Sequence, residues 1–99
     1  MKPLDKDILL MTLKNNKNKI DSFGVKRLGV FGSFIRGEQR DVSDVDILVE
    51  FEKKKKNYKN YLALSDYLEE VFKRKVDLVT SESLSPYIGP YIKKEVIYV

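Results

Sequence analysis

The most constraining feature of the sequence is an alternating segment at residues 44–51, in which apolar side chains recur at every second position: Val45, Ile47, Val49 and Phe51. Successive side chains of a β-strand point to opposite faces of the sheet, so this pattern predicts a strand with one buried face. Asp44 and Asp46 alternate with the apolar residues and fall on the other face. A chain with this segment is therefore expected to contain a sheet that carries two carboxylates on its polar side.

The surrounding sequence predicts further strands and the helices to cover them. Apolar residues at helical spacing, and short β-prone runs between turn residues, define these elements. We expect helices at residues 3–21, 33–40 and 61–72, strands at residues 25–31 and 76–80, and one short helix or strand after Pro90. A length of 99 residues allows one hydrophobic core, so we expect a single domain that spans residues 1–99.

Composition limits the chemistry. The chain has no histidine and no cysteine, which excludes thiolate and imidazole metal ligands and the usual histidine base. Any bound metal must then be held by carboxylates, which favours Mg²⁺ or Mn²⁺. The formal net charge of +4 gives only a mild preference for anionic partners. With no secretory signal and no apolar run long enough to cross a bilayer, we expect a cytoplasmic protein without a membrane partner.

A glycine-serine turn precedes the acidic strand. Gly32 would let a phosphate approach the backbone, and Ser33 adds a hydroxyl donor at the start of the short helix. Arg36 follows one turn later and could bind a phosphate or brace the loop through a carboxylate such as Glu38. Each motif taken alone has a simple structural explanation. A glycine-serine pair is a common turn, and an Asp-x-Asp pattern is common on the polar face of a strand.

Two carboxylates close together repel each other, and this repulsion must be offset by another interaction. Asp44 and Asp46 lie about 7 Å apart by strand rise, where two like charges repel by roughly 2 kcal/mol at an effective dielectric constant near 20. A pair of divalent cations offsets that repulsion, and two ions can hold a triphosphate for in-line displacement.

These residues resemble a known family. Gly32-Ser33, a ten-residue gap and Asp44-Val45-Asp46 are similar to the signature of the DNA polymerase β-like nucleotidyltransferases. The fuller pattern from Gly32 to Glu38 and from Ser43 to Asp46 resembles the minimal nucleotidyltransferase (MNT) antitoxins of that superfamily. The resemblance implies an α/β (α+β) fold with a small mixed sheet, helices packed on it and an active site at one sheet edge. Asp77 matches the third catalytic carboxylate of the superfamily.

The resemblance also implies a reaction and a partner. Asp44, Asp46 and Asp77 would be catalytic and would hold two Mg²⁺ ions, Gly32 and Ser33 would hold the phosphates of ATP, and Arg36 would support them. AMP would pass to a hydroxyl acceptor, with a tyrosine of a HEPN ribonuclease toxin as the leading candidate, so that the chain would be the antitoxin in a hetero-oligomer. No direct nucleic-acid binding is expected.

Two other functions stay open at this stage. The chain could neutralise a toxin by binding alone, with the metal site a relic, or it could transfer AMP to a small molecule. The lysine run at residues 53–56 indicates a solvated loop, with contact to nucleotide or partner as the alternative. Tyr87, Tyr91 and Tyr98 could complete the core or form a partner surface, because aromatic residues favour both.

Overall fold

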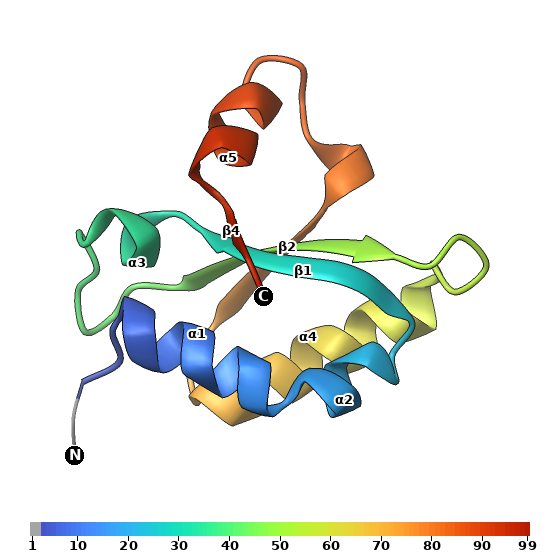
Figure 1. Ribbon diagram of the computed structural model, residues 1–99, viewed down its shortest axis with the longest axis horizontal. Coiled ribbons are helices and arrows are strands. Elements are labelled where there is room, and N and C mark those ends of the chain that lie inside the picture. Colours follow the sequence, from blue (N-terminus) through green and yellow to red (C-terminus); the bar gives the residue numbers. More distant parts are fainter. Residues whose placement is uncertain (1–2) are drawn as a thin grey trace.

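A computed structural model describes residues 3–99 and shows a four-stranded sheet in the order β3-β2-β1-β4. The strands are β1 (Val25–Phe31), β2 (Val45–Phe51), β3 (Val76–Thr80) and β4 (Ile97–Tyr98). The helices are α1 (Lys6–Asn15), α2 (Lys17–Asp21), α3 (Ser33–Arg36), α4 (Tyr58–Phe72), the 3₁₀ turn η1 (Ser81–Ser83) and α5 (Gly89–Glu95). Helices α1, α2 and α4 lie on one face of the sheet, whereas η1 and α5 form an arm that projects from the other (Figure 1).

Strand directions make the sheet mixed, as the family resemblance implied. β1 is antiparallel to both β2 and β4, and β2 is parallel to β3. Parallel neighbours need a long crossover connection, and α4 supplies it between β2 and β3. The same parallel pairing places the corresponding positions of β2 and β3 side by side, which matters for the acidic residues described below.

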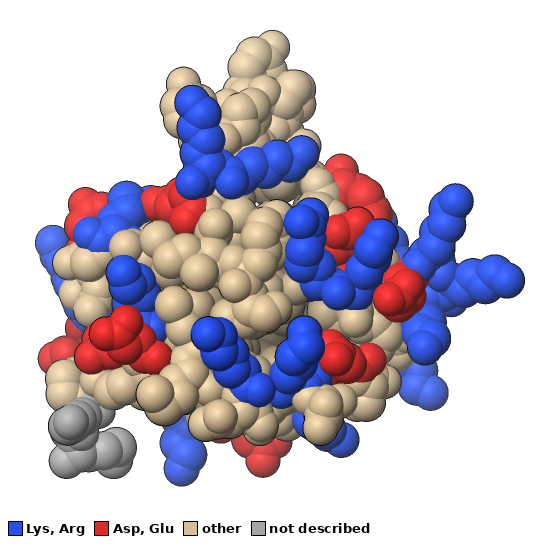
Figure 2. Space-filling view, viewed as in Figure 1, with Lys and Arg blue, Asp and Glu red and all other residues tan. Residues whose placement is uncertain are grey.

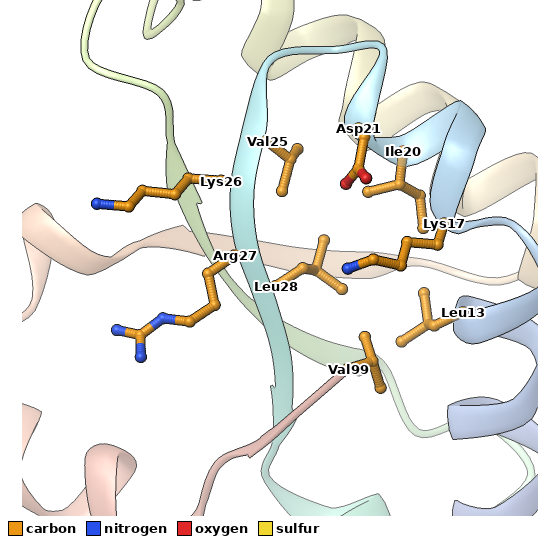
Figure 3. Close-up of a pocket in the computed structure, with 9 residues that line it drawn as sticks. All are labelled: Leu13, Lys17, Ile20, Asp21, Val25, Lys26, Arg27, Leu28 and Val99. Atoms are coloured by element: carbon orange, nitrogen blue, oxygen red, sulfur yellow. The ribbon is translucent and has the colours of Figure 1, made fainter.

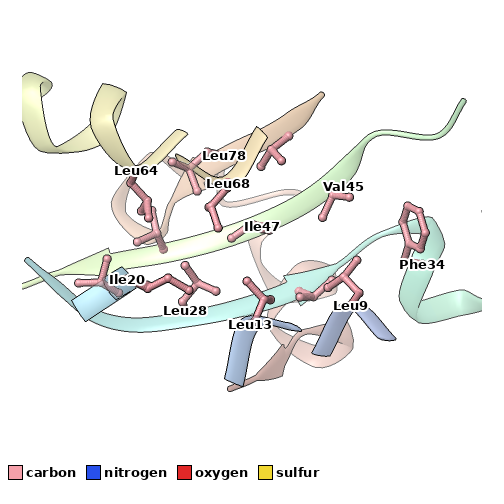
Figure 4. Packing of buried hydrophobic residues seen from close by; sticks show 14 of the residues in the cluster. Leu9, Leu13, Ile20, Leu28, Phe34, Val45, Ile47, Leu64, Leu68 and Leu78 are labelled. Carbon is pink, nitrogen blue, oxygen red and sulfur yellow. The ribbon is translucent and has the colours of Figure 1, made fainter. Parts of the chain in front are cut away.

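The hydrophobic core lies between the sheet and the three covering helices (Figure 4). Val45, Ile47, Val49 and Phe51 are all buried, which confirms the prediction from their alternation. They pack with Leu9 and Leu13 of α1 and with Leu64 and Leu68 of α4. Tyr61 and Phe72 of α4 are only partly buried and pack at the margin of this core.

Three predicted boundaries were wrong. The helix expected over residues 3–21 begins after Asp5, whose side chain caps it by accepting from the Ile8 amide at 2.9 Å, and breaks at Asn16. The short helix ends at Arg36 because Gly37 turns left-handed, with a φ of 72°. Strand β2 starts at Val45, so Asp44 stands just before it.

The C-terminal segment contains both a helix and a strand, where the sequence predicted one or the other. Strand β4 adds to the sheet through Gly29 and Val30 of β1, and α5 precedes it on the projecting arm. The side chains of Tyr87 and Tyr91 on this arm are 84% and 76% exposed, so neither completes the core. Within residues 3–99, no helix has the combination of length and apolar character needed to span a membrane.

Candidate active site

The parallel register of β2 and β3 brings two of the predicted acidic residues together. Asp46 is the direct neighbour of Asp77 across the two strands. Paired positions on adjacent strands carry their side chains on the same face, here the one opposite the covering helices. Burial, and after it the negative charges of Asp77 and Asp44, raise the pKa of Asp46 to about 6. The three aspartates that the sequence selected therefore share one electrostatic environment.

Asp44 is positioned by the loop that enters β2. The Val45 amide donates to the Lys75 carbonyl at 3.1 Å, and Arg74 Nη1 donates to the Ser43 carbonyl at 3.1 Å. These bonds fix the backbone on both sides of Asp44. The ammonium of Lys75 lies 3.9 Å from the Asp44 carboxylate, but both side chains are largely exposed, so the pair contributes little stability.

The glycine-serine turn lies directly against Asp46. Gly32 has a φ of 85°, a conformation that side chains rarely adopt, and it links the end of β1 to the start of α3. A Cβ atom at this position would lie 2.1 Å from Asp46 Oδ2. Only glycine lets the turn approach the carboxylate this closely, and Ser33 follows at the first residue of α3.

Arg36 is held by two carboxylates at the edge of this site. Its Nε donates to Glu38 Oε1 at 2.5 Å, the bracing contact that the sequence allowed, and its Nη1 donates to Glu95 Oε1 at 2.7 Å. These partners, Glu38 first, raise the pKa of Arg36 above its ordinary value, so the guanidinium stays charged. Its positive charge in turn opposes the rise in the pKa of Asp46.

The donor set suits a hard divalent cation. Among residues 3–99, the carboxylates of Asp46 and Asp77 have no hydrogen-bond or ion-pair partner, so their oxygens are available as ligands. Carboxylate oxygens are the ligands that Mg²⁺ prefers. In the same described part of the chain, no three acidic, histidine or cysteine side chains are already close enough to hold one ion. The pair of aspartates therefore fits a metal whose ligand shell also includes water and phosphate.

Two other features are separate from this site. A hollow lined by Leu13, Lys17, Val25 and Val99, among others, has a volume of only about 10 Å³, room for about one water molecule (Figure 3). It lies at the start of β1, whereas Gly32 follows the end of that strand. Residues 53–56 are exposed in the loop after β2, as predicted, and Lys56 contacts Glu82.

The fold and the paired carboxylates define a nucleotidyltransferase of the polymerase β-like type, and the comparisons with known proteins agree. The sequence matches the nucleotidyltransferase domain family over residues 10–99. It is 44% identical over 85 residues to protein adenylyltransferase MntA of Thermococcus cleftensis, covering 86% of this chain and 85% of the relative. The chain therefore belongs to the nucleotidyltransferase domain family, in its minimal branch, and is an enzyme of that class.

Solved structures share the fold. A structure described as a minimal nucleotidyltransferase superposes with a TM-score of 0.83 at 30% identity and covers 98% of each chain. A toxin-antitoxin complex with AMP-PNP gives a TM-score of 0.66 at 22% identity, covering 96% of this chain and 72% of the other. The MNT antitoxin bound to a tri-AMPylated HEPN toxin of Shewanella oneidensis gives 0.57 at 21% identity, covering 86% and 69%. At these last two identities the likeness shows the fold alone.

Sequence reasoning missed one residue of the site. Glu95, the last residue of α5, accepts a hydrogen bond from the Gly32 amide at 3.1 Å as well as the one from Arg36. It lies 63 positions from Gly32, in the segment whose structure was least defined by its sequence pattern. A single glutamate after two lysines carries no motif, so no sequence signal marked it.

Proposed function

We propose that the chain transfers AMP from ATP to a tyrosine hydroxyl of a HEPN toxin and so acts as its antitoxin. The observation that carries the proposal is the juxtaposition of Asp46 with Asp77 against the Gly32 turn. The names of the relatives add support, because they describe a protein adenylyltransferase and an MNT antitoxin in complex with a tri-AMPylated HEPN toxin. The bound AMP-PNP of another neighbour supports a nucleotide substrate.

In this proposal Asp44, Asp46 and Asp77 would hold two Mg²⁺ ions, and Asp77 would serve the acceptor side of the site. When bound, the ions would neutralise charge on the triphosphate and on the leaving pyrophosphate. Gly32 and Ser33 donate to the β and γ phosphates, and Arg36 supports them. A tyrosine oxygen forms a bond to the α-phosphorus while the bond from that phosphorus to the bridging oxygen breaks. Asp77 helps to accept the tyrosine proton.

The test is AMP transfer to the product of the neighbouring gene. The protein is incubated with ATP, Mg²⁺ and that product, and intact-mass analysis counts the AMP groups gained. We expect Asp46→Asn to reduce the rate by at least about a hundredfold, because it removes a charged metal ligand, while partner binding persists. Glu50→Gln is the matched control, since Glu50 is a carboxylate on the same face of β2 but pairs with Lys26 and Arg27 instead.

The alternative functions predict different outcomes. If Asp46→Asn modifies the partner at the normal rate, the metal mechanism is wrong. Equal toxin neutralisation by wild type and variant, with no mass gain in either, would support a protein that acts by binding alone. A mass gain on a small molecule but not on the partner would support the third function.

A further inference from the structure

The Glu95 carboxylate occupies two hydrogen-bond donors beside the acidic site. One oxygen accepts from the Gly32 amide at 3.1 Å and the other from Arg36 Nη1 at 2.7 Å. The side chain is 20% exposed, so these bonds are partly shielded from water. An anion held between a backbone amide and a guanidinium has the same donors that a phosphate oxygen would take.

The position of Glu95 is electrostatically unfavourable for an incoming nucleotide. The site already holds Asp44, Asp46 and Asp77, and Glu95 adds another negative charge near Asp46. Arg36 is shared between Glu38 and Glu95, so its charge is largely balanced within the protein. A triphosphate therefore meets carboxylates beside a guanidinium, that of Arg36, which is already paired.

Glu95 also links the site to the projecting arm. It is the last residue of α5, and β4 follows after Val96 and ties the chain to β1. The arm before it carries exposed apolar side chains, including Tyr87, Ile88 and Tyr91. In Figure 2 this arm stands above the body of the molecule and is formed mostly of uncharged residues. Glu95 is thus the contact through which the turn at Gly32 holds the base of that arm.

We propose that Glu95 is a built-in competitor of the nucleotide: in the free protein its carboxylate takes the Gly32 amide and the Arg36 guanidinium, and nucleotide binding displaces it and loosens α5. The inference rests on the proposed function, which assigns these donors to the phosphates. It differs from a purely structural role for Glu95 in the sign of its effect. A competitor lowers nucleotide affinity, because only the displaced state binds, whereas a brace for the turn would raise it.

The first experiment measures the dissociation constant of AMP-PNP with Mg²⁺ by calorimetry. We expect Glu95→Gln to bind about five- to tenfold more tightly than wild type, because the neutral amide holds Arg36 less strongly. Glu95→Asp, one methylene shorter, should change affinity in the same direction while keeping the charge. The matched control is Glu38→Gln, which removes the other carboxylate on Arg36 but leaves the Gly32 amide paired. Its affinity should stay within about twofold of wild type.

The second experiment follows amide hydrogen exchange of residues 89–95. In wild type, AMP-PNP should speed exchange in α5, and in Glu95→Gln exchange should already be fast without nucleotide. Weaker or unchanged AMP-PNP binding by Glu95→Gln, with circular dichroism showing a folded protein, would make Glu95 a brace and overturn the inference alone. If wild type and all variants fail to bind nucleotide, the proposed function fails and the inference falls with it.

Discussion

On the face of the sheet that α1, α2 and α4 cover, Ile47 and Val49 are fully buried among apolar side chains. On the opposite face of the same strand, Asp46 and Glu50 are only partly buried and carry charge. Apolar burial at roughly 25 cal/mol per Å² makes the covered face the main source of stability. The two faces of one strand thus separate the residues that hold the fold from those that serve the site.

The open face is not simply solvent-exposed. Leu48 is buried there between Asp46 and Glu50, and Phe31, the cross-strand partner of Asp46, is also buried. Apolar neighbours lower the local dielectric and disfavour charge, which is the main reason that the pKa of Asp46 is raised. The acidic face therefore loses stability because it keeps unpaired carboxylates beside one another, a cost commonly found at functional sites.

The largest effect should come from the covered face. Leu68 is fully buried on α4, and Leu68→Ala should lower the free energy of unfolding by about 2–5 kcal/mol through lost burial and the cavity left behind. Glu50→Ala on the open face removes only two partly exposed ion pairs and should cost at most about 1 kcal/mol. Urea titration of both variants measures the difference, and equal losses would contradict the division between the faces.

An intermediate loss of stability is expected at the Gly32 turn, which lies against Asp46. Gly32→Ala must place a Cβ atom 2.1 Å from Asp46 Oδ2 at a φ of 85°. We expect a loss of at least about 2 kcal/mol, because a strained backbone and displacement of the carboxylate act together. AMP-PNP affinity should fall as well, since the turn cannot keep its place.

Gly37→Ala is the control for backbone strain alone. Gly37 also has a positive φ, 72°, but nothing lies within 4 Å of a Cβ atom built on it. Its substitution should cost about 1 kcal/mol and leave nucleotide affinity unchanged. If the two alanine variants lose equal stability and equal affinity, close contact between Gly32 and Asp46 is not what makes glycine necessary there.

Much of this arrangement could be predicted from local patterns. The alternation in β2 predicted which side chains are buried, because a strand's faces follow directly from a period of two. It also placed Asp46 on the opposite face. Asp77 was named only because it matches the third carboxylate of the polymerase β-like family, and the parallel register pairs it with Asp46. Their roles as metal ligands stay predictions.

The features that the sequence did not predict depend on contacts between residues far apart in the chain. The helix break at Asn16 coincides with a hydrogen bond from the Tyr67 hydroxyl to its side chain, 51 positions away. The position of Glu95 depends on how α5 and β4 return to β1. Neither can be read from spacing in the sequence, since periodicity reports which face an element buries and not where a loop brings the chain back.

The smallest effect is expected at Asp46, where substitution should raise the free energy of unfolding instead of lowering it. The pKa of Asp46 is about 6 in the folded protein, whereas its ordinary value is 3.8. Ionising this carboxyl therefore costs more free energy in the folded state than in the unfolded one. Stability therefore falls as pH rises between these two values. Asp46→Asn removes the charge and should raise the free energy of unfolding by about 1 kcal/mol at pH 7–8, allowing for partial solvent screening.

The gain from Asp46→Asn should disappear as the pH falls below about 4, because Asp46 is then protonated in both states. Urea titrations of wild type and variant across pH 3–8, without divalent cations, measure the difference. Adding Mg²⁺ should stabilise wild type and not the variant, since binding to the folded state alone raises its stability. A gain that does not change with pH would show that the asparagine acts through packing, and would remove the electrostatic contrast between the two faces at this position.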